Sequence, residues 1–262
     1  MMFGTYLGIQ PYKYIKIMIL TSMVLKPHYL IPLNGIITWL DSSDTSTMTF
    51  NGGDISAWKC KINTSSVSYN QTTAARQPTY NSTKKALYFA NYEYLELAGN
   101  TLYNGPYYTE FIILEPAVNI GTGSRIIIRH GYNTSTTLTA MFSESNLIRF
   151  HSRNTSNGFI VSQLSVGSGV YALNELSMLY GAWKSDNTVN LESNEIVATA
   201  GTGANNAAKT HTISRIGSQT SSISQFFYGY IYEIIIYKRD LDSSEKTQVY
   251  NYLKNKYGLW KL

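Results

Sequence analysis

Short apolar runs alternate with polar turn residues along most of the chain, between positions 35 and 237. The runs recur about every 8–12 residues, and the segments between them are rich in Gly, Asn, Ser and Thr. This spacing is typical of antiparallel strands in a β-sandwich or barrel. The predicted strands are 36–40, 55–60, 86–89, 94–97, 109–114, 125–129, 137–142, 147–150, 159–164, 176–183, 188–191, 195–199, 212–216 and 226–237.

The periodicity within these runs distinguishes two kinds of strand. Leu147 and Arg149 are predicted to face one side of their strand, with Ile148 and Phe150 on the other. The isoleucine run 234–236 shows no alternation. A run of this kind fits an inner strand that is covered on both faces.

A helix is predicted after the last strand, over about 243–257. Asp242 can cap its N-terminus, and Glu245, three residues later, completes a capping box. Gly258 stands where a C′ glycine is expected. Apolar residues at helical spacing between these signals predict an amphipathic helix that lies against the sandwich.

The segment before the first predicted strand carries an apolar stretch at 15–25 that resembles the core of a signal peptide. Lys16 interrupts it, no small-residue cleavage site follows, and it is shorter than the roughly 20 residues that a membrane span needs. We therefore expect residues 1–34 to form an extended arm and 35–262 to form the sandwich domain. A cleaved signal peptide remains the alternative.

Composition narrows the class of protein. Charged residues make up 14% of the 262 residues, against about 25% in most soluble domains, while aromatic residues reach 13% and include 22 tyrosines. The apolar content excludes a disordered chain, and the residue types do not suit a coiled coil. Cys60 is the single cysteine, so no intramolecular disulfide forms, and we expect it to pack as a small hydrophobic residue.

The formal net charge of +5 is located at the two ends of the chain. Positions 36–237 hold 12 basic and 13 acidic residues, so the predicted sandwich is nearly neutral. A nucleic-acid-binding protein would show a basic stripe across the domain, so no nucleic-acid partner is expected. The cationic ends instead suit docking to an acidic neighbouring protein. The lysines predicted to dock are Lys13, Lys16, Lys26, Lys254 and Lys256.

Two pairs of segments together resemble a known superfamily. Near the start are GIITWLDSSDTSTMT (35–49) and ISAWK (55–59), and near the end are FYGYIYEIIIYKRDLDSSE (227–245) and VYNYLKNKYGL (249–259). This pattern resembles the concanavalin A-like lectin/glucanase superfamily, in the laminin-G-like form found in large DNA viruses, phages and bacterial surface proteins. The resemblance implies an all-β, antiparallel, two-sheet jelly-roll sandwich. It does not imply an activity, because this fold carries lectins, hydrolases and structural modules.

An enzyme of this superfamily would be a glycosidase, whose retaining forms place two carboxyl groups about 5–5.5 Å apart. Residues i and i+2 share one face of a strand. The one acidic pair at this spacing, Asp240/Asp242, lies at the entry of the predicted helix and suits a cap better. Three other close acidic pairs are at i and i+3, which places their side chains on opposite faces of a strand. Those pairs are Glu93/Glu96, Glu192/Glu195 and Asp41/Asp44. Cross-strand pairs stay open, although the sequence favours a protein that is not an enzyme.

No cofactor is expected from the sequence. The four histidines, at 28, 130, 151 and 211, show no zinc-ligand spacing. His151 and Arg153 share a strand face, which is more typical of a solvated surface than of a site. Calcium binds to related lectin folds, and segments 41–44 and 185–187 are the local candidates, but both have few carboxylates.

A loop around Gly105-Pro106 is the most suggestive of sugar binding, since such sites combine an exposed aromatic ring with amides and hydroxyls. Its candidate contact residues are Tyr103, Asn104, Tyr107 and Tyr108. Packing of these tyrosines at the rim of the sheet is the favoured alternative.

Three functions remain. The first is a structural or surface component of a large assembly, such as a minor capsid or decoration protein of a virion, docked through its ends. The second is a carbohydrate-binding, lectin-like module or adhesin in an extracellular or cell-surface location. The third is a glycoside hydrolase.

Overall fold

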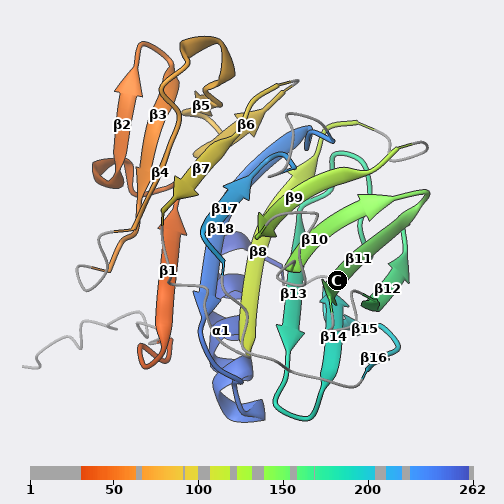
Figure 1. The fold of residues 1–262 in the computed structure, drawn as a ribbon. Helices are drawn as coiled ribbons and strands as arrows, with labels where there is room; N and C mark the ends of the chain where they lie inside the picture. The colour runs from red at the N-terminus through yellow and green to blue at the C-terminus, as the bar shows by residue number, and fades with distance from the viewer. Residues whose placement is uncertain are drawn as a thin grey trace, which may run out of the picture.

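Two packed β-sheets and a helix make up the chain in a computed structural model (Figure 1). The structure describes residues 31–62, 67–90, 92–99, 107–118, 123–131, 139–153, 158–167, 169–203, 211–219 and 225–259. Within these ranges the predicted class is confirmed: the chain is an antiparallel β-sandwich with one C-terminal helix.

The first of the two sheets is called the front sheet here. Its order is β2 (Met48–Asn51), β3 (Asp54–Lys59), β4 (Ser68–Asn70), β7 (Leu95–Ala98), β17 (Ile213–Ile216), β9 (Arg125–His130), β10 (Thr139–Glu144), β11 (Leu147–Arg153) and β12 (Phe159–Ser165). Along the chain, the 3₁₀ turn η1 (Thr45–Thr47) directly precedes β2, and the 3₁₀ turn η2 (Ala74–Arg76) follows β4.

The second sheet, the back sheet, is built around the long strand β18 (Gly229–Tyr237). On one edge of β18 lie β1 (Ile36–Asp41) and β6 (Ala86–Phe89), end to end. On its other edge the order is β8 (Tyr108–Pro116), β13 (Ser177–Trp183), β14 (Thr188–Ser193) and the short β15 (Ile196–Val197) and β16 (Gly201–Thr202). Strand β5 (Thr79–Asn81) pairs with both β6 and β3, and so joins the two sheets.

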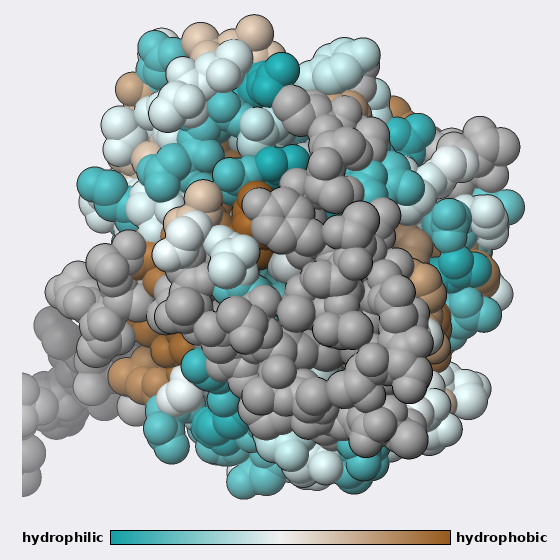
Figure 2. Space-filling model, in the orientation of Figure 1, coloured by the Kyte–Doolittle hydropathy of each residue, from teal (hydrophilic) through white to brown (hydrophobic). Residues whose placement is uncertain are grey.

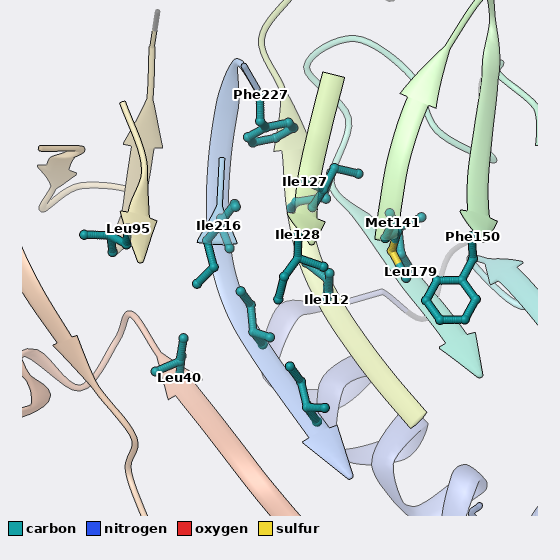
Figure 3. Packing of buried hydrophobic residues seen from close by; sticks show 14 of the residues in the cluster. Leu40, Leu95, Ile112, Ile127, Ile128, Met141, Phe150, Leu179, Ile216 and Phe227 are labelled. Carbon is teal, nitrogen blue, oxygen red and sulfur yellow. The ribbon is translucent and has the colours of Figure 1, made fainter. Parts of the chain in front are cut away.

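The main core fills the space between the sheets. Met141 and Phe150 from the front sheet pack against Ile112 and Leu179 from the back sheet (Figure 3). In β11 the predicted alternation is confirmed, because Ile148 and Phe150 point into this core and are fully buried. The opposite face of β11 is therefore left for other contacts.

Strand β18 is buried on both faces, as its unbroken isoleucine run predicts. Ile234 and Ile236 face the front sheet, whereas Ile235 and Tyr237 belong to a second cluster under helix α1 (Ser243–Tyr257). Val249 and Leu253 bring the helix into that cluster. The helix thus covers the outer face of the back sheet, behind β18 and β8 in Figure 1.

The ends of α1 follow the predicted signals. The Asp242 carboxylate accepts from the backbone N–H of Glu245 at 2.8 Å, and the Glu245 carboxylate accepts in return from the N–H of Asp242. Gly258 takes the left-handed conformation (φ 71°), and its N–H donates to Lys254 O. The helix bounds therefore match the sequence prediction.

The structure differs from the predicted strands in several short regions, including the unpredicted two-residue strand β16. Strands β2, β4 and β5 have only three or four residues each, too few for a recognisable period. The strand predicted over 226–237 begins at Gly229, where the backbone passes close to β8. A Cβ at Gly229 would lie 2.3 Å from Glu115 O, so only glycine permits this approach.

Of the predicted arm 1–34, residues 1–30 lie outside the described residues. Ile31 is buried and joins the cluster under α1. Trp58 is fully buried in the main core, and Cys60 packs against that core in a partly buried position. No helix in the described ranges is long and apolar enough to cross a membrane.

Candidate functional site

The outer face of the front sheet is the broad sheet surface that α1 leaves uncovered. The described surface seen from this side is mostly teal and white, with small brown areas between (Figure 2). A pocket of about 260 Å³ opens on this face over β9–β12. Its described lining consists of Ser124, Ile126, Arg129, Phe142, Glu144, Arg149, His151, Phe159, Val161, Gln219 and Gln225.

Three aromatic side chains contact one another in this pocket, and two of them are stacked. The His151 ring lies 4.9 Å from the Phe159 ring at an interplanar angle of 27°, and 4.7 Å from the Phe142 ring at 58°. Phe159 is 50% exposed, so its ring offers an apolar surface to a ligand. Phe142 is buried, and its ring packs against that of His151.

Charged groups stand next to the stack. Arg149 Nη1 donates to Glu144 Oε2 at 2.5 Å, and its Nε donates to Gln163 Oε1 at 3.1 Å. This leaves Arg149 Nη2 and Glu144 Oε1 without partners among the described residues. The exposed Gln225 adds an amide at the rim. The pocket therefore combines an apolar ring with a hydrogen-bond donor, an acceptor and an amide.

The register of the strands brings these residues together. Phe142 on β10 lies opposite Arg149 on β11, and His151 on β11 lies opposite Val161 on β12. Residues opposite each other in register point to the same side of a sheet, so alternate positions of three strands meet in one pocket. The shared face of His151 and Arg153 was the available signal in the sequence, which favoured a solvated surface there instead.

The residues of the predicted sugar-binding loop are only partly described. Tyr103 and Asn104 lie outside the described residues. Tyr107 is half-buried just before β8, and Tyr108 is buried with its ring stacked 6.4 Å from that of His130. The structure thus places Tyr108 inside the sandwich, away from the lining of the pocket over β9–β12.

The predicted docking lysines are also divided. Lys13, Lys16 and Lys26 lie outside the described residues. Lys254 pairs with Glu195, and Lys256 pairs with two buried carboxylates, so both ammonium groups make contacts within the chain. Docking of these lysines to a partner stays a prediction.

A buried cluster of charges fastens α1 to the back sheet. Asp41 on β1 lies opposite Glu233 on β18, and Lys256 Nζ lies 2.7 Å from a carboxylate oxygen of each. Lys61 also pairs with Asp41 at 2.8 Å. Burial opposes ionisation of Asp41, but Lys256 and Lys61 outweigh it and lower its pKa to about 2.

The same cluster holds hydroxyl and indole donors. The hydroxyls of Tyr252 and Tyr257 donate to Glu233, as does Nε1 of Trp39. Burial and the Glu233 charge raise the pKa of both tyrosines well above the ordinary value. Each of these groups is bonded within the chain, so the cluster is structural, and Glu233 pairs with a basic neighbour, Lys256.

A serine, a histidine and a glutamate form a chain of hydrogen bonds in the interior. His130 Nδ1 lies 2.8 Å from Ser214 Oγ, and Nε2 lies 3.2 Å from Glu110 Oε2. All three side chains are almost fully buried, and Ser214 is bonded to the Tyr69 hydroxyl. A catalytic nucleophile must be accessible to its substrate, whereas these side chains are buried. The hydrogen bonds among Ser214, His130 and Glu110 therefore stabilise the core and have no catalytic role.

In both candidate calcium-binding segments, a carboxylate makes contacts within the chain. Asp41 is held by lysines, and Asp186 Oδ1 accepts from the backbone and hydroxyl of Thr188. Within the described ranges, no group of three or more His, Cys, Asp or Glu side chains is arranged to hold a metal ion.

Comparison with known proteins shows the fold. No protein-family model and no curated protein matches the chain. Among solved structures, Trypanosoma rangeli sialidase in complex with sialic acid is similar over 87% of this chain and 34% of its own, at 13% identity and a TM-score of 0.56. The chain therefore spans about a third of that protein's length.

Two further structures are similar at lower TM-scores. The botulinum neurotoxin type G receptor binding domain matches over 83% of this chain and 51% of its own, at 12% identity and a TM-score of 0.49. The CBM40 of Ruminococcus gnavus IT-sialidase bound to α2,3-sialyllactose matches over 57% and 84%, at 11% identity and 0.48. The similarity to the sialidase structure agrees with the antiparallel β-sandwich fold described above.

Proposed function

We propose that the chain is a carbohydrate-binding, lectin-like module that holds a glycan against the ring of Phe159 on the outer face of the front sheet. The supporting observation is the half-exposed Phe159 stacked on His151, beside the Arg149–Glu144 pair. Sugars present C–H faces that pack on aromatic rings and hydroxyls that need donors and acceptors. Arg149 Nη2, Glu144 Oε1 and the Gln225 amide supply these groups at one place.

The charges of the pocket favour a sugar with an acidic group. Its described lining carries two guanidinium groups, those of Arg129 and Arg149, against the single carboxylate of Glu144. A carboxylate or sulfate on the glycan would meet a net positive field, and a planar guanidinium can bind it with two hydrogen bonds.

Binding is favoured over hydrolysis by the same lining. Glycosidases use two carboxyl groups that flank the scissile bond, about 5–5.5 Å apart in retaining enzymes and about 6.5–9.5 Å apart in inverting enzymes. Glu144 is the one carboxylate among the described residues of the pocket. The neighbouring acid, Glu110, is buried in the core.

The similar structures are compatible with this proposal but are not evidence for it. At sequence identities of 13% or below, these structures show a similarity of fold alone. The sialic acid and the sialyllactose are ligands of two of those proteins. The resemblance to the laminin-G-like form of the concanavalin A-like superfamily is part of the proposal, as is an extracellular or surface location. A role in a virion rests on residues 1–34 and stays a prediction.

A glycan array tests the proposal directly. The wild-type protein is expected to bind a set of acidic glycans, and Phe159→Ala to lose about tenfold or more in affinity, because the stacking surface is removed. Phe50→Ala is the matched control, since Phe50 is 44% exposed on β2, away from the pocket. Its binding is expected to equal that of the wild type.

Arg149→Gln supplies the second arm of the test. It keeps hydrogen-bonding capacity but removes the positive charge, so binding of acidic glycans should fall more than binding of their neutral counterparts. If the wild-type protein binds no glycan on the array, or if Phe159→Ala binds as the wild type does, the proposed function is wrong.

A further inference from the structure

We infer that the module has a second sugar pocket on the same sheet face, at Thr72, Tyr94 and Glu96, which binds a neutral sugar of the glycan held at Phe159. This inference rests on the proposed function and extends it. The second pocket has a volume of about 290 Å³ and lies where the loop after β4 meets β7. It is similar in size to the first pocket, and none of the predicted site residues lines it.

A single row of paired residues shows that both pockets open on one face. Glu96 on β7 lies opposite Arg215 on β17, and Arg215 lies opposite Arg129 on β9. Glu96 lines the second pocket and Arg129 lines the first. Because residues paired in register point to the same side of a sheet, the two pockets share the outer face of the front sheet.

Glu96 is positioned to accept a hydrogen bond from a ligand. Both Nε and Nη2 of Arg215 donate to Glu96 Oε2, so Glu96, which lines the pocket, keeps Oε1 without a partner among the described residues. The Arg215 guanidinium also lies 4.3 Å from the centre of the Tyr94 ring. Arg215 thus fixes the carboxylate and the aromatic ring in place, which lowers the ordering cost of binding.

Two hydroxyl groups complete the second pocket. Thr72 is exposed and Tyr94 is half-buried, and their hydroxyls have no partner among the described residues. Carboxylate and hydroxyl acceptors beside an aromatic ring suit the hydroxyls of a sugar. The ion pair of Glu96 with Arg215 leaves this pocket without net charge, so a neutral sugar fits it better than an acidic one.

The spacing of the strands sets the length of the glycan. From β7 at the second pocket to β12, which carries Phe159, the strand order is β7, β17, β9, β10, β11 and β12, which is five strand spacings or about 24 Å. A single sugar cannot reach both pockets, whereas a longer chain or a branched glycan can. Two linked contacts raise the affinity for long glycans well above that for each sugar alone.

The test uses an array that prints acidic and neutral glycans, each as single sugars and as longer linear and branched chains. Thr72→Leu removes one hydroxyl and fills the second pocket, and Tyr94→Phe removes the other hydroxyl while keeping the ring over Arg215. Both variants are expected to bind long glycans about tenfold more weakly and single acidic sugars as the wild type does. Thr49→Leu, at an exposed position of β2, is the matched control.

The outcomes separate this inference from the proposed function. If the wild type binds long glycans, and Tyr94→Phe and Thr72→Leu bind every glycan as the wild type does, the second pocket binds no sugar. In that case the proposed binding at Phe159 is unaffected. If the wild type binds nothing, the proposed function fails and the inference fails with it. Circular dichroism checks that each variant is folded. If Thr72→Leu is unfolded, the result with Tyr94→Phe decides the test.

Discussion

Asp41 and Glu233 face each other across strands β1 and β18, and the ammonium group of Lys256 lies 2.7 Å from both carboxylates. Two carboxylates this close would repel each other without a shared cation. The cation comes from α1, so the contact works only when the helix is docked. Helix and sheet are thus held together by charge as well as by apolar packing.

Lys256→Met should therefore destabilise the fold. The substitution leaves Glu233 without its ammonium partner in a buried position, and we expect a loss of about 3 kcal/mol in the free energy of unfolding, measured by urea denaturation. Lys254→Met is the matched control on the same helix. Its partner Glu195 is 44% exposed, so its loss should stay below about 1 kcal/mol, and equal losses would contradict the shared-cation interpretation.

Stability should fall in acid because of Asp41. Its folded pKa is about 2, below the unfolded value of 3.8, so the stabilisation is complete above about pH 4 and is lost as pH falls through the folded value. The contribution amounts to about 2 kcal/mol. Urea titrations between about pH 4 and pH 2 measure it, and Asp41→Asn should flatten that part of the profile.

The N-terminal cap of α1 should contribute about 1 kcal/mol to the free energy of unfolding. Asp242→Ala removes the acceptor of the Glu245 N–H, and thermal unfolding should report a correspondingly lower Tm. Asp242→Ser keeps an acceptor at the same place and should restore most of the loss. No recovery with serine would mean that the charge of Asp242, rather than its capping bond, matters.

Gly181 should not tolerate a side chain. It lies in β13 at the main core, where an added Cβ would come within 2.8 Å of Met141 Cε and Phe150 Cδ2. Gly181→Ala is expected to cost about 1–3 kcal/mol in urea denaturation. Gly53→Ala is the control, because nothing lies within 4 Å of its added Cβ, and it should leave stability unchanged or raise it slightly.

The sequence predicted those parts of the fold that depend on local patterns. Asp242, Glu245 and Gly258 marked both ends of α1 correctly, and the isoleucine run of β18 indicated its burial on two faces. Strands β2, β4 and β5 were missed because three or four residues show no period. They form because neighbouring strands supply hydrogen-bond partners that are distant in sequence.

The candidate site was harder to predict for a related reason. Phe142, His151 and Phe159 come from three strands, and only their register brings them together. The sequence drew attention instead to the segment around Gly105-Pro106, whose candidate Tyr108 lies buried at the start of β8. Likewise, Asp41 accepts a backbone N–H bond from the nearby Ser43, but its pairing with Lys256 spans most of the chain.

The position of β18 in the middle of the back sheet affects how the chain reaches its native state. Trp39 on β1 contacts Glu233 on β18 across 194 positions of sequence. The edges of β1, β6 and β8 therefore stay unpaired until β18 has been synthesised and inserted between them. Such non-local pairing implies slow folding and a late intermediate with open strand edges, which a chaperone would need to shield from aggregation.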